Sequence, residues 1–137
     1  MSLVRTYLDT SVILNAWKGQ DEARIHALKI LDDENRIILA SVFLRLELLP
    51  KPTFHKNRLE LDFLNLVFSR AELVADAARI SEVAVDLAAE FDLAPMDALQ
   101  AASAIVGQAA EFLSFEKPTK PIYRLPPELL RVVPLSP

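Results

Sequence analysis

The chain contains no cysteine in its 137 residues, only two glycines and only two histidines. Without cysteine there is no disulfide, no cysteine-ligated zinc or iron–sulfur centre and no thiol nucleophile. Gly19 and Gly107 are too few for a Walker phosphate loop or a dinucleotide-binding fingerprint, since both need several glycines at fixed spacing. His26 and His55 stand in unrelated contexts, which excludes a histidine-rich metal cage. Carboxylates and hydroxyls remain as the groups available for chemistry.

The charge balance also lacks an excess of positive charge, because 15 Lys and Arg face 19 Asp and Glu for a net charge of −4. A uniformly basic nucleic-acid-binding surface is therefore excluded, although a local basic patch is not. No apolar run approaches the roughly 20 residues of a membrane span. Arg5 and Asp9 interrupt the start of the chain before a signal peptide's apolar region develops. We expect a cytoplasmic protein with one domain over residues 1–137.

Short apolar segments alternate with amphipathic ones along the chain. Strands are expected at 3–8, 36–40 and 112–115, and short extended pieces at 72–75 and 131–133. Helices are expected at 12–18, 21–33, 42–49, 55–68, 76–91 and 96–110, with Pro50 and Pro52 ending the third and Pro95 opening the last. Strands separated by helices predict an α/β fold with a mainly parallel sheet. In such folds, the reactive site lies beyond the carboxyl ends of the strands.

Four acidic residues occupy notable positions. Asp9 and Glu116 each follow a predicted strand, and Glu47 and Asp97 each lie on a helix that is otherwise apolar. Each also has a purely structural explanation. Asp9 would cap a helix, Glu47 would pair with Lys51 four residues on, Asp97 would meet a helix dipole, and Glu116 would be a solvated loop residue.

The four acids taken together favour a metal site. All four would meet at the carboxyl edge of one parallel sheet. When ionised carboxylates lie so near one another, they need a cation between them. Oxygen ligands suit hard divalent ions, with Mg²⁺ or Mn²⁺ fitting best. Such a site typically activates water for displacement at phosphorus.

Four stretches of the sequence resemble the PIN domain family, in the small prokaryotic type found as VapC-like toxins of toxin–antitoxin pairs. They are residues 7–14 (YLDTSVIL), 40–48 (ASVFLRLEL), 96–102 (MDALQAA) and 112–116 (FLSFE). Their order and spacing match the family over nearly the whole chain. The resemblance implies a three-layer α/β/α sandwich and a metal-dependent endoribonuclease that hydrolyses RNA.

The same resemblance assigns roles to individual residues. Asp9, Glu47 and Asp97 would bind the Mg²⁺ or Mn²⁺ ion, and Glu116 would complete the catalytic set directly or through water. Two hydroxyl partners would orient carboxylates or water, namely Ser11 and Ser114.

Two positions depart from the family pattern. Glu116 stands where Asp is usual, and its extra methylene carries the carboxylate farther; Ser114 stands where Thr is usual. The first departure keeps a different function open, a catalytically degenerate PIN-like module whose acidic pocket binds a partner or an ion. A structure-selective DNA nuclease uses the same ion chemistry, but such enzymes usually carry extra regions that this chain lacks.

Basic and amphipathic segments suggest partner surfaces. Arg45, Lys51 and Lys117 are expected to contact RNA phosphates beside the acids. The helices expected at 21–33 and 55–68 are candidates for binding an antitoxin or a second copy of the chain in a homodimer. An antitoxin would block the groove in which these basic residues hold RNA, and one of its arginines would enter the acidic pocket.

Overall fold

The computed structural model describes residues 2–136. A five-stranded sheet forms its centre, with strands β1 (Val4–Leu8), β2 (Arg36–Ser41), β3 (Glu72–Val74), β4 (Glu111–Ser114) and β5 (Val132–Pro134). The helices are α1 (Thr10–Lys18), α2 (Asp21–Leu31), α3 (Val42–Leu48), α4 (Pro50–Phe54), α5 (Arg58–Arg70), α6 (Ala77–Phe91) and α7 (Pro95–Val106), with a short 3₁₀ helix η1 (Pro121–Arg124). Among the described residues, no helix combines the length and apolarity needed to cross a membrane.

All neighbouring strands of the sheet are parallel, in the order β3-β2-β1-β4-β5. The chain moves outward from β1 to β2 and β3 on one side, and then returns to place β4 on the other side of β1. The direction of winding therefore reverses between β1 and β4, which is where α/β sheets form ligand-binding crevices. Leu8 of β1 lies level with Leu113 of β4, so these two strands end together.

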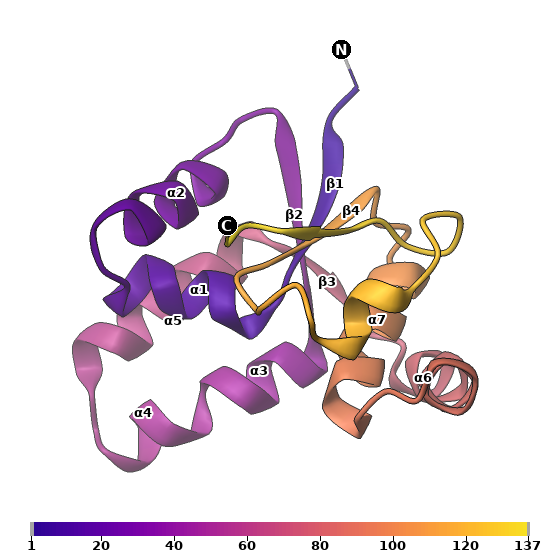
Figure 1. The fold of residues 1–137 in the computed structure, drawn as a ribbon. Helices are drawn as coiled ribbons and strands as arrows, with labels where there is room; N and C mark the ends of the chain where they lie inside the picture. The colour runs from indigo at the N-terminus through magenta and orange to yellow at the C-terminus, as the bar shows by residue number, and fades with distance from the viewer. Residues whose placement is uncertain (1, 137) are drawn as a thin grey trace.

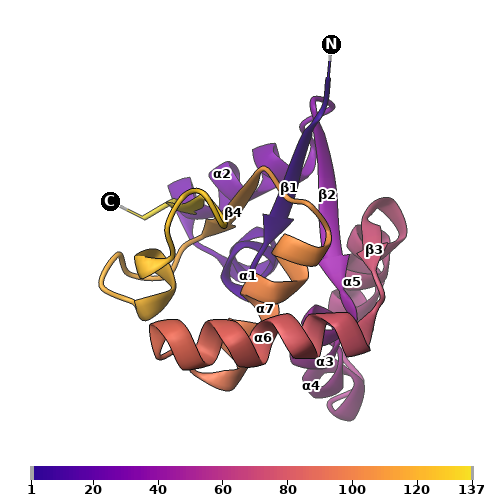
Figure 2. The same cartoon turned by 90° about the vertical axis from the view of Figure 1, so that its right-hand side faces the viewer.

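Helices cover both faces of the sheet, as predicted for an α/β/α sandwich. In Figure 1, α1, α2 and α5 lie on one side of the strands, and α6 and α7 lie on the other. Figure 2 shows the second layer from the front, with α6 and α7 passing before the strands. Side chains on the two faces of the sheet consequently belong to two separate hydrophobic clusters.

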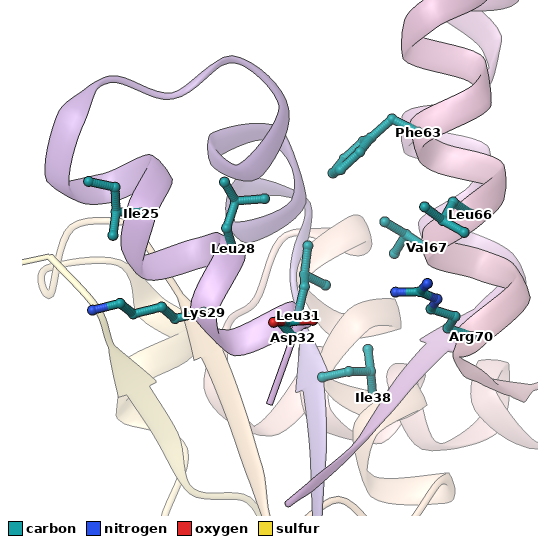
Figure 3. A pocket seen from close by; sticks show the side chains of 10 residues that line it. All are labelled: Ile25, Leu28, Lys29, Leu31, Asp32, Ile38, Phe63, Leu66, Val67 and Arg70. Carbon is teal, nitrogen blue, oxygen red and sulfur yellow. The ribbon is translucent and has the colours of Figure 1, made fainter. Parts of the chain in front are cut away.

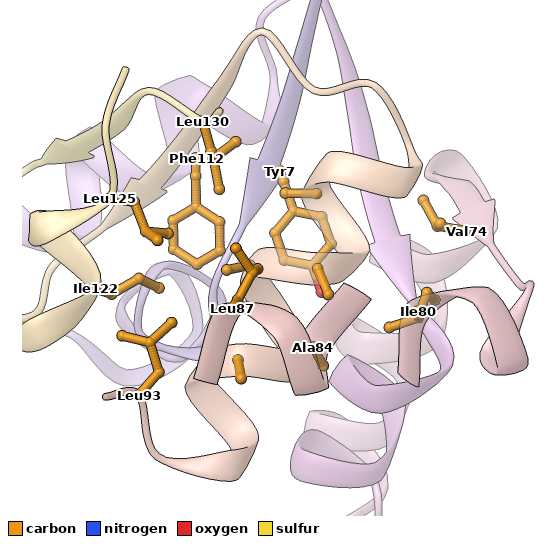
Figure 4. Close-up of a cluster of buried hydrophobic side chains, with 14 of the residues drawn as sticks. Tyr7, Val74, Ile80, Ala84, Leu87, Leu93, Phe112, Ile122, Leu125 and Leu130 are labelled. Atoms are coloured by element: carbon orange, nitrogen blue, oxygen red, sulfur yellow. The ribbon is translucent and has the colours of Figure 1, made fainter. Parts of the chain in front are cut away.

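The core under α6 and α7 is built around two aromatic side chains from adjacent strands. Tyr7 and Phe112 are fully buried, and their rings stack with centroids 5.4 Å apart. Figure 4 shows both rings facing Leu87 of α6, with Ile122 and Leu125 closing the cluster beside Phe112. The opposite core uses the alternate residues of the same strands, including Leu8 and Leu113.

Capping residues fix where several helices begin. The side chain of Asp9 accepts a hydrogen bond from the backbone N–H of Ser11 at the start of α1, and Ser41 accepts one from Leu44 at the start of α3. Asp76 caps α6 in the same way. The chain therefore turns into a helix directly after β1 and directly after β2, which places α1 and α3 beside the carboxyl edge of the sheet.

One helix was missed, and several predicted helix ends differ from those observed. α3 ends at Leu48, just before Pro50, as predicted, but Pro50 also begins a separate short helix, α4. In the first turn of that helix the missing N–H and fixed φ of Pro50 and Pro52 are tolerated. The helix expected at 55–68 is α5, which begins at Arg58 after the Asn57 cap. Helix α7 ends at Val106 rather than at residue 110, because Gly107 terminates it.

Candidate active site

Asp9 sits at the point where the sheet reverses its winding. It directly follows β1, and its backbone N–H donates to the carbonyl of Leu113 on β4 at 3.2 Å. Both oxygens of its carboxylate are held. Oδ1 accepts from the Ser11 backbone N–H at 3.0 Å and from the Ser11 hydroxyl, while Oδ2 accepts from the Ser114 hydroxyl at 2.5 Å.

The two serines have equivalent bonding patterns. Besides donating to Asp9, Ser11 Oγ accepts the backbone N–H of Phe115 at 2.9 Å, and Ser114 Oγ accepts the backbone N–H of Glu116 at 3.0 Å. Each hydroxyl thus joins the Asp9 carboxylate to the loop that follows β4. The arrangement fixes the rotamer of Asp9 and the backbone of that loop at the same time.

The Asp9 carboxylate is largely withdrawn from water. Burial raises its pKa from 3.8 to about 6, although the hydrogen bonds from Ser11 and Ser114 oppose that rise. The nearby charge of Glu116 raises the pKa further. Ionised Asp9 is therefore an anion whose environment favours the arrival of a positive charge.

Glu47 reaches the same place from α3. Its Oε1 atom accepts hydrogen bonds from the side-chain amide of Gln100 at 2.6 Å and from the hydroxyl of Thr10 at 3.0 Å. No ion pair joins it to Lys51 within residues 2–136, so the structural explanation offered for Glu47 does not hold. The helix instead directs the carboxylate across the pocket toward α1 and α7.

Asp97 lies in the first turn of α7, where the dipole of the helix favours a negative charge. Gln100 follows one turn later and lies on the same face of the helix. Helix α7 therefore contributes one half-buried carboxylate and one buried amide to the pocket.

Glu116 is exposed on the loop after β4. The hydroxyl of Tyr123 on η1 donates to its backbone carbonyl at 2.8 Å, and Ser114 accepts its backbone N–H. The backbone of Glu116 is therefore fixed from both sides, while its side chain stays accessible to solvent.

These acids line one small pocket of about 70 Å³. Its walls come from four regions of the chain, the residues being Asp9, Thr10, Ser11, Glu47, Asp97, Gln100, Phe112, Glu116, Lys120 and Ile122. All four predicted acids are among them. Within the described residues, however, no three His, Asp or Glu side chains converge closely enough to form a ready metal cage. The set of donors is chemically suited to a hard divalent ion, but the carboxylates would have to draw together around it.

The basic residues expected to contact RNA have different environments. All three are exposed, but the guanidinium of Arg45 also lies over the ring of Phe68, 5.3 Å from its centroid. Contact between these three side chains and RNA stays a prediction. Of the described residues that line the acidic pocket, Lys120 alone is basic.

Sequence reasoning did not select three of the polar residues that line the pocket. Thr10 and Lys120 were given no role at the site from the sequence. Gln100 was overlooked, although a long polar side chain in so apolar a helix was a usable signal. Its burial, with only 4% of its surface exposed, shows that it needed partners inside the protein.

Comparison with known proteins agrees with this architecture. The chain is similar to the VapBC2 structure from Rickettsia felis, bound to a DNA fragment from their promoter, with a TM-score of 0.75 and 20% identity over 97% of this chain and 100% of that one. It is also similar to a toxin–antitoxin complex from Klebsiella pneumoniae, with a TM-score of 0.68 and 22% identity over 93% and 95% of the two chains. A search of curated proteins found no match. The model of the PIN domain matches residues 6–120, and the chain therefore belongs to the PIN domain family.

Proposed function

We propose that this protein is a metal-dependent endoribonuclease and the toxin of a toxin–antitoxin pair. The observation that carries the proposal is the pocket at the sheet's reversal point, where carboxylates from four separate elements face a single small volume. Membership of the PIN family supports a nuclease. Fold similarity to chains from toxin–antitoxin complexes supports the toxin role.

Asp9, Glu47 and Asp97 would hold Mg²⁺ or Mn²⁺, and Glu116 would act directly or through water. When bound, the ion would supply a more acidic water and offset the charge that develops at phosphorus. Asp9 would be the ligand with a fixed position, since hydroxyl donors already hold both of its carboxylate oxygens. Exposed Glu116 would orient or deprotonate the attacking water, and Lys120, which lines the same pocket, would hold a phosphate oxygen.

Purified protein incubated with single-stranded RNA tests the catalytic part. We expect cleavage with Mn²⁺ and none with EDTA, and we expect Asp97→Asn and Asp9→Asn to abolish cleavage without unfolding the protein. Asp92→Asn is the matched control. Asp92 is an exposed acid five residues before Asp97, it does not line the pocket, and its left-handed backbone (φ 54°) suits Asn.

Three other outcomes would count against this function. Retained cleavage by Asp97→Asn would contradict the assigned role. No cleavage by the wild type at any Mn²⁺ concentration would favour the degenerate binding module, which the absence of a ready cage among residues 2–136 also favours. Cleavage of single-stranded DNA in place of RNA would assign the same site to a DNA nuclease.

The antitoxin would bind a groove of about 430 Å³ between α2 and α5. Figure 3 shows side chains of these two helices lining its sides, with Ile38 of β2 at its base. Leu28, Leu66 and Ile25 line it and remain 37%, 49% and 55% exposed. Such apolar exposure between two helices suits the apolar face of a partner helix.

Co-expression with the product of an adjacent small reading frame tests this partner. We expect Leu66→Asp to abolish co-purification, whereas Val85→Asp, an equally drastic change at an exposed position on α6, should leave it intact. Analytical ultracentrifugation of the chain alone tests the expected homodimer. If Leu66→Asp dissociates a homodimer but leaves antitoxin binding unchanged, the groove belongs to the second copy instead.

A further inference from the structure

Gln100 occupies an unusual place for an amide. It lies on α7 with 4% of its surface exposed, in a helix whose other buried positions are mostly alanine. An amide in such surroundings is costly unless both its ends are bonded. Both ends are bonded here, since Nε2 donates to Glu47 Oε1 at 2.6 Å and Oε1 accepts from the hydroxyl of Tyr7.

The direction of this chain of hydrogen bonds follows from the chemistry of its ends. An ionised carboxylate only accepts, so Gln100 presents its NH₂ group to Glu47 and its carbonyl to Tyr7. Tyr7 must then donate to Gln100. The single hydroxyl proton of Tyr7 is thereby used, so at the 2.8 Å contact with Ser41 it is the serine that donates.

The chain ends on the backbone. Ser41 Oγ accepts the N–H of Leu44 at 3.1 Å, and Ser41 is the cap of α3, the helix that carries Glu47. Four successive hydrogen bonds therefore run from the first turn of α3 through Ser41, Tyr7 and Gln100 to Glu47. Tyr7 and Ser41 are fully buried, so water does not compete for these bonds.

The bonding leaves Glu47 half anchored. Oε1 carries both donors, Gln100 and Thr10, while no described residue donates to Oε2. Glu47 itself is exposed and has a long, flexible side chain, so without these donors it would sample many rotamers. Gln100 also lies one turn after Asp97 on the same helix, which links the placement of two of the pocket's carboxylates.

We propose that Gln100 is a positioning residue that holds Glu47 toward the pocket with one oxygen free to bind the divalent ion, and that Tyr7 fixes Gln100 in this role. The inference rests on the metal site of the proposed function. Partners that orient the ligands of a metal commonly affect ion affinity about tenfold or more when they are removed. The effect should therefore appear in ion binding as well as in catalysis.

The test measures Mn²⁺ binding by isothermal titration calorimetry on the whole chain without RNA. Gln100→Met keeps the length of the side chain but removes both hydrogen bonds, and we expect the Kd for Mn²⁺ to rise about tenfold. Tyr7→Phe keeps the buried ring and frees the Gln100 carbonyl, and we expect a rise of a few fold. Thr6→Val is the control, because it removes a buried hydroxyl of the same strand that bonds Glu111 and takes no part in the hydrogen bonds leading to Glu47.

Cleavage assays add a second readout. If Gln100 acts through ion binding, Gln100→Met should lower kcat at limiting Mn²⁺ and recover at saturating Mn²⁺, with KM for RNA unchanged. A Kd for Gln100→Met equal to that of the wild type would overturn the inference. If that variant does not fold, an unchanged Kd in Tyr7→Phe would overturn it equally. A wild type that binds no Mn²⁺ would instead refute the proposed metal site.

Discussion

Ser114 donates a hydrogen bond of 2.5 Å to Asp9, although 105 residues separate them in the sequence. The bond joins the ends of β1 and β4, the two strands between which the sheet reverses its winding. Ser114 is fully buried, and burial also dominates the pKa of Asp9. The fold thus places an anion in a poorly hydrated position and surrounds it with neutral donors instead of a cation.

The first prediction concerns stability against pH. Because the folded pKa of Asp9 is about 6 and its ordinary value is 3.8, the folded state binds this proton more tightly than the unfolded state does. Its contribution to stability is fully present below pH 4 and is lost as the pH rises through 6. Each pKa unit corresponds to about 1.4 kcal/mol, so the loss amounts to a few kcal/mol. Urea unfolding in EDTA at pH 4.5 to 7.5 measures it.

Asp9→Asn is the control for that experiment, since Asn keeps the size of the side chain but does not ionise. The variant should not lose stability as the pH rises through 6, so the difference in unfolding free energy between variant and wild type should grow with pH. Adding Mn²⁺ at pH 7.5 should restore stability to the wild type alone, because a ligand of the folded state stabilises it. Parallel pH profiles for the two proteins would contradict the account of Asp9.

The second prediction concerns the hydroxyl of Ser114. Ser114→Ala removes one donor to Asp9 and one acceptor for the N–H of Glu116, so we expect a loss of about 1–2 kcal/mol in unfolding free energy. Cleavage at limiting Mn²⁺ should fall about tenfold as Asp9 loses its orientation. Ser69→Ala, which removes an exposed hydroxyl bonded only to the carbonyl of Leu66 on its own helix, should change neither quantity.

Periodicity and capping chemistry predicted most of the fold because both act locally. Asp9 and Ser41 cap the helices that follow β1 and β2, and such caps are legible in a sequence without any tertiary information. The carboxyl-edge rule then brought Asp9 and Glu116 together from strand positions alone. Helix α4 was missed because Pro50 and Pro52 were assigned only a helix-ending effect, when the first turn of a new helix accepts proline equally well.

The partners of the site could not be predicted in the same way. The Gln100–Glu47 bond spans 53 residues and depends on how α7 crosses α3, which no local pattern specifies. The cation–π contact of Arg45 with Phe68 likewise depends on how α5 packs against α3. The missing information was burial. A polar side chain requires a hydrogen-bond partner within the protein only if it is buried, and the sequence alone does not show which polar side chains are buried.

The third prediction separates stability from activity at the opposite edge of the sheet. Arg36 bonds Glu111 at 2.8 Å, and their side chains are 24% and 12% exposed. Arg36→Met leaves the Glu111 carboxylate with only the hydroxyl of Thr6 as a donor, so we expect a loss of about 2 kcal/mol in unfolding free energy. The rate at which Arg36→Met cleaves RNA should equal that of the wild type at temperatures below the unfolding transition.

Arg58→Met is the matched control for this ion pair. Arg58 and Asp62 lie 4.0 Å apart and are 86% and 67% exposed, and pairs so exposed contribute little. The control should therefore lose well under 1 kcal/mol (about 0–0.5). A loss in Arg36→Met no larger than in the control would show that the half-buried pair of Arg36 and Glu111 does not stabilise the sheet.

The fourth prediction tests Lys120 as a phosphate contact. Lys120→Met removes the one positive charge among the described residues lining the acidic pocket, so we expect KM for RNA to rise about tenfold while kcat changes less. Neutralising one phosphate contact on a single strand should also reduce the slope of log affinity against log salt by about 0.7. Lys29→Met, which removes a charge of the same kind from the α2–α5 groove, should leave both unchanged. If the two variants shift KM and the salt slope equally, the effect is one of overall charge and Lys120 has no specific contact with RNA.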